Sequence, residues 1–311
     1  MKDIKIGFIG FGEAAPVLAG ALAREGTRIT AYDILLQTNN GDEILKRRSN
    51  GSNIHFLPLK EVVTSSDYIL STVTTQAAKD VAQECIQYLR PGQIYLDLNS
   101  MAPSKKIEIS NIISESGADF VEGAILGAIG VTGGKTHILT GGIRGAETAR
   151  LLSDLGLNVS FYREEIGKAS MFKMLRSIFS KGMEALLLEM LTAGKRAGIA
   201  DDLWADINEL LNGRPFEQTA SNWIKTHPAA CKRRYYEMVQ VTETVHELGI
   251  EPFMSTGTRA MFESSMLLGF DKVFSEKPDS IEEVIAFMEA ASKNIGKRNE
   301  YEENNSTEKV D

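Results

Sequence analysis

Three small residues near the amino terminus are spaced to receive a phosphate. The segment reads Gly10-x-Gly12-x-x-Ala15, directly after an apolar run and directly before a helical periodicity. In such a turn the first glycine allows a tight bend, the second lets a pyrophosphate approach the backbone, and the third small residue lets the helix pack on the strand. Free N–H groups at the start of that helix attract the negative charge. The pattern predicts a dinucleotide site formed by Gly10, Phe11, Gly12, Glu13 and Ala14.

An acidic residue, Asp33, ends the second apolar run and bears on the choice of dinucleotide. A carboxylate at this place accepts hydrogen bonds from a ribose diol and repels a 2′-phosphate. The next residue is Ile34 rather than an arginine, so NAD is favoured over NADP. The basic residues Lys46, Arg47 and Arg48 keep NADP as the alternative, although they also fit a solvated helix face.

The elements that must position these residues alternate along the first 165 positions. Short apolar runs predict strands, and between several of them apolar residues recur with a helical period, as from Ala14 to Leu22. Such alternation predicts βαβ units and a mostly parallel, doubly wound Rossmann sheet, which makes this part an α/β domain. The expected strands are residues 4–9, 28–32, 68–73, 94–98, 120–126, 137–140 and 159–162.

After residue 167 the pattern becomes helical throughout. We expect one long helix over 171–197 and further helices over 203–211, 230–248, 254–268 and 281–295. The sequence therefore predicts a dinucleotide-binding Rossmann domain (1–165) followed by an all-helical domain (166–296). The polar and charged residues 297–311 are expected to form a disordered tail.

Composition excludes several other classes of protein. The 311 residues fit about two domains at ~100–200 residues each. Lys and Arg total 34 against 42 Asp and Glu, a net charge of -8, which argues against nucleic-acid binding. Cys85 and Cys231 lie far apart and form no CxxC pair, which indicates a cytoplasmic protein. No cluster of metal ligands and no membrane-spanning apolar run is present, so we expect neither a metal nor a membrane partner.

Four segments together resemble the β-hydroxyacid dehydrogenase family, which includes 3-hydroxyisobutyrate and 6-phosphogluconate dehydrogenases. They are the glycine turn at 10–15, Leu-Asn-Ser-Met-Ala-Pro at 98–103, Val-Glu-Gly-Ala-Ile-Leu-Gly-Ala at 121–128, and residues 167–177. The resemblance covers almost the whole chain and implies a Rossmann domain, a helical domain for substrate binding and dimerisation (166–296), and a long helix that joins them and carries a catalytic lysine. Residues 233–238 resemble a poorly characterised branch with a phosphogluconate-dehydrogenase-like helical domain.

The resemblance assigns general acid/base chemistry to Lys173, with Ser177 one helical turn further on. Alcohol oxidation needs a base for the hydroxyl proton, and a free lysine with a pKa of about 10.4 is too basic for that role. Burial between the domains and beside a positively charged nicotinamide would lower the pKa. The competing interpretation is a surface lysine on an amphipathic helix.

The remaining site residues follow from the same resemblance and from the carboxyl edge of the sheet, where open α/β sheets bind ligands. Ser100 is expected at the substrate or as a helix N-cap, and the backbone near Gly127 as a carboxylate site or a flexible loop. The family's Ser-Gly-Gly signature is replaced by Leu126-Gly127-Ala128. We expect Thr72, Val73, Thr74 and Asn99 to line the dinucleotide, and Ser100, Gly127, Ala128, Arg176 and Arg233 to bind an anionic substrate.

The resulting hypothesis is NAD(P)-dependent hydride transfer between the nicotinamide and a small 3-hydroxy acid or its carbonyl form. A catalytically silent dinucleotide-binding scaffold and an imine reductase are the alternatives, and Lys173 counts against both. Oxidative decarboxylation of 6-phosphogluconate is disfavoured because Ser180 stands where a carboxylic acid would act. The resemblance also implies a homodimer or a higher homo-oligomer.

Overall fold

The computed structural model describes residues 4–293. The chain divides into two compact units, Met1–Phe179 and Ser180–Asp311. The long helix α8 (Lys168–Ala197) contributes residues to both units. The predicted tail, 297–311, lies outside the described residues.

The first unit contains an eight-stranded sheet in the described part of the chain, with the order β3-β2-β1-β4-β5-β6-β7-β8. Only the β6–β7 pair is antiparallel among the described strand pairs. The order reverses at β1, as in a doubly wound Rossmann sheet, and the predicted fold class is confirmed. The strands are β1 (Lys5–Ile9), β2 (Arg28–Tyr32), β3 (Ile54–Phe56), β4 (Tyr68–Ser71), β5 (Ile94–Asp97), β6 (Asp119–Leu126), β7 (His137–Gly141) and β8 (Val159–Arg163).

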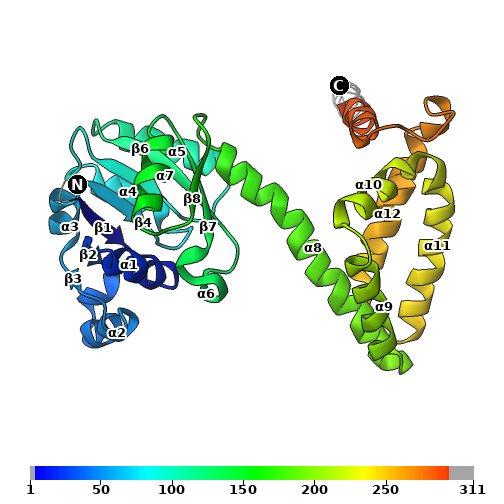
Figure 1. Cartoon of the computed structure of the whole chain (residues 1–311), viewed down its shortest axis with the longest axis horizontal. Coiled ribbons are helices and arrows are strands. Elements are labelled where there is room, and N and C mark those ends of the chain that lie inside the picture. The colour runs from blue at the N-terminus through cyan, green and yellow to red at the C-terminus, as the bar shows by residue number, and fades with distance from the viewer. Residues whose placement is uncertain (1–3, 294–311) are drawn as a thin grey trace, which may run out of the picture. The chain divides into compact units, whose positions relative to one another are not determined.

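Helices cover both faces of this sheet (Figure 1). Helices α1 (Ala14–Arg24) and α7 (Gly145–Asp154) bury Leu18, Leu22 and Leu152 against one face. Helices α3 (Leu59–Ser65), α4 (Ala78–Cys85) and α5 (Pro103–Ser114) cover the other face with side chains such as Ile113. Each fully buried Leu or Ile contributes roughly 1.5–3 kcal/mol relative to exposure. Two shorter helices, α2 (Gly41–Arg48) and α6 (Ile129–Thr132), complete the unit.

The second unit is helical, as expected. It contains α9 (Ala200–Asn212), α10 (Phe216–Lys225), α11 (His227–Glu247), α12 (Phe253–Leu267) and helical residues 281–293. Cys231, Phe270 and Val284 form a small buried cluster. Glu189 of α8 accepts hydrogen bonds from the backbone N–H groups of Met254 and Ser255, which fixes the start of α12.

Two elements and one boundary differ from the expectations. Strand β3 has only three residues, none of them fully buried, so it lacks the apolar run that marks its neighbours. Helix α10 lies between two expected helices, where no helix was predicted. The first compact unit also continues to Phe179 rather than ending at 165, because the start of α8 is hydrogen-bonded to β6.

Candidate active site

The glycine turn after β1 has the geometry that the sequence predicts for a phosphate cradle. Gly10 has a φ of 85°, and a Cβ there would lie 2.7 Å from the carbonyl oxygen of Thr72. The turn is held by two hydrogen bonds: Gly10 N donates to Tyr32 O at 2.8 Å, and Thr72 Oγ1 donates to Gly10 O at 2.8 Å. A Cβ on Gly12 would meet nothing within 4 Å, so the backbone is open to a ligand there.

The start of α1 supplies unpaired donors next to this opening. The backbone N–H groups of Gly12, Glu13 and Ala14 have no partner among the described residues. A helix amino terminus carries partial positive charge as well as free N–H groups, so the cradle is complementary to a pyrophosphate. The residues present therefore fit a bound NAD(P), which the turn and α1 would hold through their backbone.

Asp33 has a second task that the sequence analysis did not assign. Its buried carboxylate accepts hydrogen bonds from Phe11 N at 2.6 Å and from Leu35 N at 2.9 Å. The aspartate thus ties the glycine turn to the end of β2. The Phe11 side chain is fully buried and packs edge-on against Phe56, with ring centroids 5.0 Å apart. The buried Phe11 ring therefore supports the glycine turn from inside the core and is not exposed to a ligand.

Arg48 stands apart from the other basic residues of α2. Its Nη1 donates to Phe11 O at 2.9 Å, which places an exposed guanidinium beside the glycine turn. Lys46 and Arg47 are exposed. Arg48 is thus the basic residue of α2 whose guanidinium reaches the predicted dinucleotide site.

We expect the protein to bind NAD more tightly than NADP, because the Asp33 carboxylate at the end of β2 repels a 2′-phosphate. Isothermal titration calorimetry with both dinucleotides measures the difference. Equal or tighter binding of NADP would contradict the prediction and implicate Arg48. In that case Arg48→Met would weaken NADP binding by about tenfold or more, whereas Lys46→Met on the same helix would not.

Two further strands bring predicted residues to the same edge of the sheet. Thr72 and Val73 are half-buried after β4, and Thr74 is exposed. Asn99 is buried after β5, where its Nδ2 donates to Ser71 Oγ at 3.0 Å and its Oδ1 has no partner among the described residues. That buried oxygen is available to a ligand donor.

Ser100 and the end of β6 are open to solvent. Ser100 is exposed, and α5 begins at Pro103 with Ala102 in the N-cap position, so Ser100 does not cap that helix. Gly127 and Ala128 are exposed immediately after β6, and Gly127 has a φ of 137°. Gly127 has no side chain and Ala128 has only a methyl group, so a substrate there could form hydrogen bonds only with their backbone groups.

Lys173 lies in the second turn of α8 and is half-buried. Burial lowers the pKa of its amine, and the Lys106 ammonium lowers that pKa further. The Ser177 hydroxyl donates to the backbone carbonyl of Lys173 at 2.9 Å, so in this structure it is engaged by the helix. Arg176 is exposed on the same helix. Arg233 belongs to the second unit, where it is exposed and pairs with Glu237.

Glu122 holds the start of α8, the helix of Lys173, and the sequence analysis did not predict this role. Its fully buried carboxylate accepts hydrogen bonds from Gly167 N at 2.8 Å, Ala169 N at 2.9 Å, Ser170 N at 3.3 Å and Ser170 Oγ at 2.8 Å. These donors lie at the start of α8, three to six residues before Lys173. The available signal was an acidic residue within the apolar run 120–126.

Comparison with known proteins agrees with this geometry. Residues 5–162 match the NAD binding domain of 6-phosphogluconate dehydrogenase, and residues 195–265 match a domain of unknown function, DUF1932. The fold and the glycine cradle define an NAD(P)-dependent oxidoreductase. The chain belongs to the β-hydroxyacid dehydrogenase family, as this match and the likeness to 3-hydroxyisobutyrate dehydrogenase show.

Three relatives illustrate the range of the family fold. One is a conserved protein of unknown function that is described as structurally similar to 3-hydroxyacid dehydrogenases. It is 31% identical to this chain, the match covers 84% of this chain and 96% of that protein, and the TM-score is 0.57. Mitochondrial 3-hydroxyisobutyrate dehydrogenase from Mus musculus is 22% identical over 82% of this chain and 76% of that protein. An imine reductase from Myxococcus stipitatus, solved with NADP+, shares the fold with a TM-score of 0.73 at 17% identity, covering 91% and 99% of the two chains.

Residues 4–293 contain neither a metal-binding cluster nor a membrane-spanning helix. No group of three or more His, Cys, Asp and Glu side chains in this range is arranged to hold a metal ion. No helix in the same range is both long and apolar enough to span a membrane.

Proposed function

We propose that the protein transfers hydride between NAD(P) and a small 3-hydroxy acid or its carbonyl form, with Lys173 as the general acid/base. The observation that carries this proposal is the half-buried Lys173, whose pKa is lowered by burial and by Lys106. A lysine amine with a lowered pKa is neutral in a larger fraction of molecules near pH 7, and only the neutral amine accepts a proton.

The proposed chemistry divides between the dinucleotide and the chain. When bound, NAD(P) would be held by the glycine turn and the start of α1 and would supply the hydride acceptor. Lys173 Nζ takes the hydroxyl proton as the O–H bond breaks, and the oxygen's electron pair completes the C=O bond. In the reverse direction the protonated Lys173 amine returns a proton to the oxygen.

Substrate selection would rest on groups at the carboxyl edge of the sheet. We expect the substrate carboxylate to accept hydrogen bonds from backbone N–H groups near Gly127 and Ala128 and from the exposed Ser100 hydroxyl. Arg176 is exposed on the helix of Lys173 and offers a positive charge to the same class of ligand. Together these groups favour a small acid over a neutral alcohol.

Two other functions compete with this one. The structural likeness to an imine reductase favours carbon–nitrogen double-bond reduction as a second candidate. A catalytically silent dinucleotide-binding scaffold is the third candidate. Such a protein would not need a half-buried lysine with a lowered pKa.

The deciding experiment supplies purified protein with NAD or NADP and a panel of 3-hydroxy acids, the matching carbonyl compounds with the reduced dinucleotide, and cyclic imines. Absorbance of the reduced nicotinamide reports turnover. Oxidation of one or more 3-hydroxy acids supports the proposal. Turnover restricted to imines would establish the second function, and dinucleotide binding without any turnover would establish the third.

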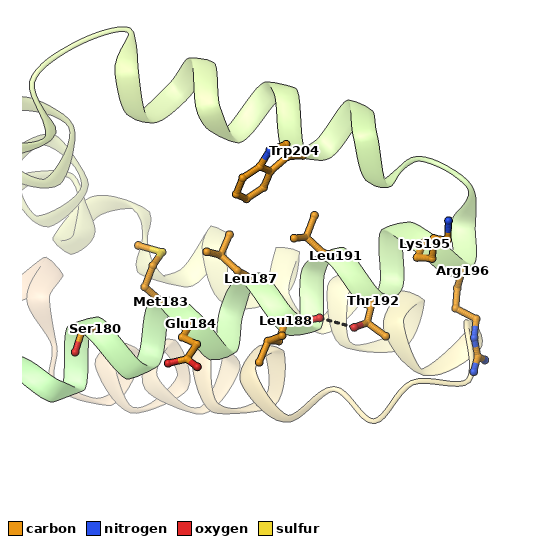
Figure 2. A pocket seen from close by; sticks show the side chains of 10 residues that line it. All are labelled: Ser180, Met183, Glu184, Leu187, Leu188, Leu191, Thr192, Lys195, Arg196 and Trp204. Carbon is orange, nitrogen blue, oxygen red and sulfur yellow. Dashed lines mark hydrogen bonds between the residues drawn. The ribbon is translucent and has the colours of Figure 1, made fainter. Parts of the chain in front are cut away.

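We also propose that the protein is a homodimer or a higher homo-oligomer, assembled through its second unit. An apolar groove of about 830 Å³ lies between α8 and α9 and is lined by Leu187, Leu188, Leu191 and Trp204 (Figure 2). Leu188 is 65% exposed and Trp204 is 50% exposed. A contiguous apolar surface of this kind favours association, and a second copy of the same helices offers matching apolar side chains.

Light scattering at micromolar concentration is therefore expected to give at least the mass of a dimer. Leu188→Arg places a charge in the apolar groove and is expected to shift the mass toward the monomer. Glu184→Gln, at the polar margin of the same groove, is the matched control and should leave the mass unchanged. A monomeric wild-type protein would contradict the proposal.

A further inference from the structure

Side chains from the segment that ends β4 hold the loop that follows β5. Ser71, the last residue of β4, is fully buried, and its Oγ accepts a hydrogen bond from Asn99 Nδ2 at 3.0 Å. Four residues further on, the exposed Thr75 hydroxyl donates to Ser100 O at 2.7 Å. Two consecutive residues after β5 are therefore each bonded to a hydroxyl side chain of the β4 segment.

The backbone on both sides of these two residues is also fixed within the first unit. Asn99 N donates to Asp97 Oδ1 at 2.9 Å, and the buried Lys106 Nζ donates to the same oxygen at 2.7 Å. Met101, which follows Ser100, is buried in the core between the sheet and helices α3, α4 and α5. With both ends of the loop held, the two hydroxyl contacts decide how the Asn99 amide and the Ser100 carbonyl are oriented.

This arrangement leaves Asn99 Oδ1 without a partner. Asn99 is 5% exposed, and its Oδ1 accepts no hydrogen bond within residues 4–293. A buried acceptor without a donor costs about 1–3 kcal/mol, so a ligand that brings an N–H or O–H group to it is favoured. Because Nδ2 donates to Ser71, a half-turn of the amide that exchanges the two atoms would break that bond. The loop therefore presents a hydrogen-bond acceptor rather than a donor.

The strand order indicates which part of a dinucleotide meets this acceptor. Strands β4 and β5 lie on one side of β1, whereas β2, which ends at Asp33, lies on the other side. A dinucleotide bound across such a crevice has its adenosine ribose at the end of β2 and its pyrophosphate at the glycine turn after β1. The nicotinamide half then extends over the ends of β4 and β5, and its ribose hydroxyls and carboxamide are hydrogen-bond donors.

We propose that Ser71 and Thr75 are positioning residues for the nicotinamide half of the dinucleotide. They fix Asn99 and Ser100 so that Asn99 Oδ1 accepts a hydrogen bond from that half. The inference rests on the proposed function only in placing NAD(P) at the glycine cradle, and it requires no hydride transfer. Without these contacts the loop has more orientations to lose when the ligand binds, which lowers the affinity.

Four variants test this role. Thr75→Val removes the hydroxyl but keeps the size and the β-branch, and should weaken NAD binding by about three- to tenfold. Thr75→Ser restores the hydroxyl and should restore most of the affinity. Ser71→Ala removes the acceptor of Asn99 Nδ2 and should weaken NAD binding by at least the same factor. Thr64→Val is the matched control, because Thr64 is an exposed threonine of α3 whose hydroxyl donates to Lys60 O at 2.8 Å. It should leave NAD binding unchanged.

Isothermal titration calorimetry with NAD and with ADP separates positioning from a general effect on the fold. ADP has the adenosine and both phosphates but lacks the nicotinamide riboside, so every variant should bind it as the wild-type protein does. Weaker NAD binding with unchanged ADP binding, restored in Thr75→Ser, supports the inference. An equal loss of both ligands, or unchanged NAD affinity in Thr75→Val and Ser71→Ala, would overturn it. If Ser71→Ala does not fold, the exposed Thr75 variants decide. No turnover is measured, so failure of the proposed hydride transfer is seen separately in the activity screen.

Discussion

Replacing Lys173 with Met is expected to lower turnover by about two to four orders of magnitude, the usual contribution of a positioned proton-transfer group. Met keeps most of the apolar stem and removes the amine, so the packing of α8 should survive. Dinucleotide binding should remain normal because the pyrophosphate cradle consists of Gly10, Gly12 and the start of α1. Steady-state kinetics and calorimetry on the same preparation separate the two effects.

The pH dependence of turnover should follow the protonation state of Lys173. Burial and Lys106 lower the pKa of Lys173, so the neutral amine becomes available at a lower pH than for a free lysine. Oxidation of the alcohol should therefore rise with pH as the amine loses its proton, and reduction of the carbonyl should fall over the same interval. The variant should lose this limb of the profile in both directions.

The control for this experiment is Lys181→Met on the same helix. Lys181 is exposed and pairs with Glu184 at 3.1 Å, so its loss should leave turnover and the pH profile unchanged. Near-normal turnover with an intact pH limb in Lys173→Met would disprove the acid/base role. Loss of dinucleotide binding in that variant would instead show that Lys173 supports the fold.

Glu122→Gln is expected to destabilise the first unit and to weaken catalysis together. The carboxylate accepts four hydrogen bonds in the wild-type protein, whereas an amide directs an N–H group toward at least one of those donors. A buried donor left without an acceptor costs about 1–3 kcal/mol, and more where the lost partner was charged. Because these donors begin the helix of Lys173, we expect turnover to fall by roughly ten- to a hundredfold through misplacement of the amine.

Hydrogen–deuterium exchange locates this effect. Amides of Gly167, Ala169 and Ser170 should exchange faster in Glu122→Gln, and circular dichroism should show a lower unfolding temperature. Tryptophan fluorescence should change little, since Trp204 and Trp223 both lie in the second unit. Glu61→Gln replaces an exposed glutamate of α3 and should alter neither the exchange rates at the start of α8 nor the unfolding temperature. Unchanged exchange at the start of α8 would refute the anchoring role of Glu122.

Local sequence patterns were sufficient for much of the fold and for part of the site. The alternation of apolar runs with helical periods predicts the Rossmann sheet, because the side chains of strands and helices repeat with different periods. The small residues at 10, 12 and 15 predict the cradle, because only glycine tolerates the positive φ and close contact at Gly10. The pattern does not predict the short strand β3, because its three residues are too few, and too exposed, to show a period.

The tertiary structure decided which polar groups support the site. The sequence places Asp33, Lys106 and Glu122 near the ends of elements or within them, but their partners depend on how those elements pack. Asp33 meets Phe11 across 22 positions, and Glu122 meets Gly167 across 45. A buried charge must find its compensating donors or acceptors wherever the fold brings them, and no local periodicity encodes that distance. The chemistry of Lys173 is thus suggested by its sequence segment, whereas the charges and hydrogen bonds that tune it arise only when strands β5 and β6 and helices α5 and α8 come together.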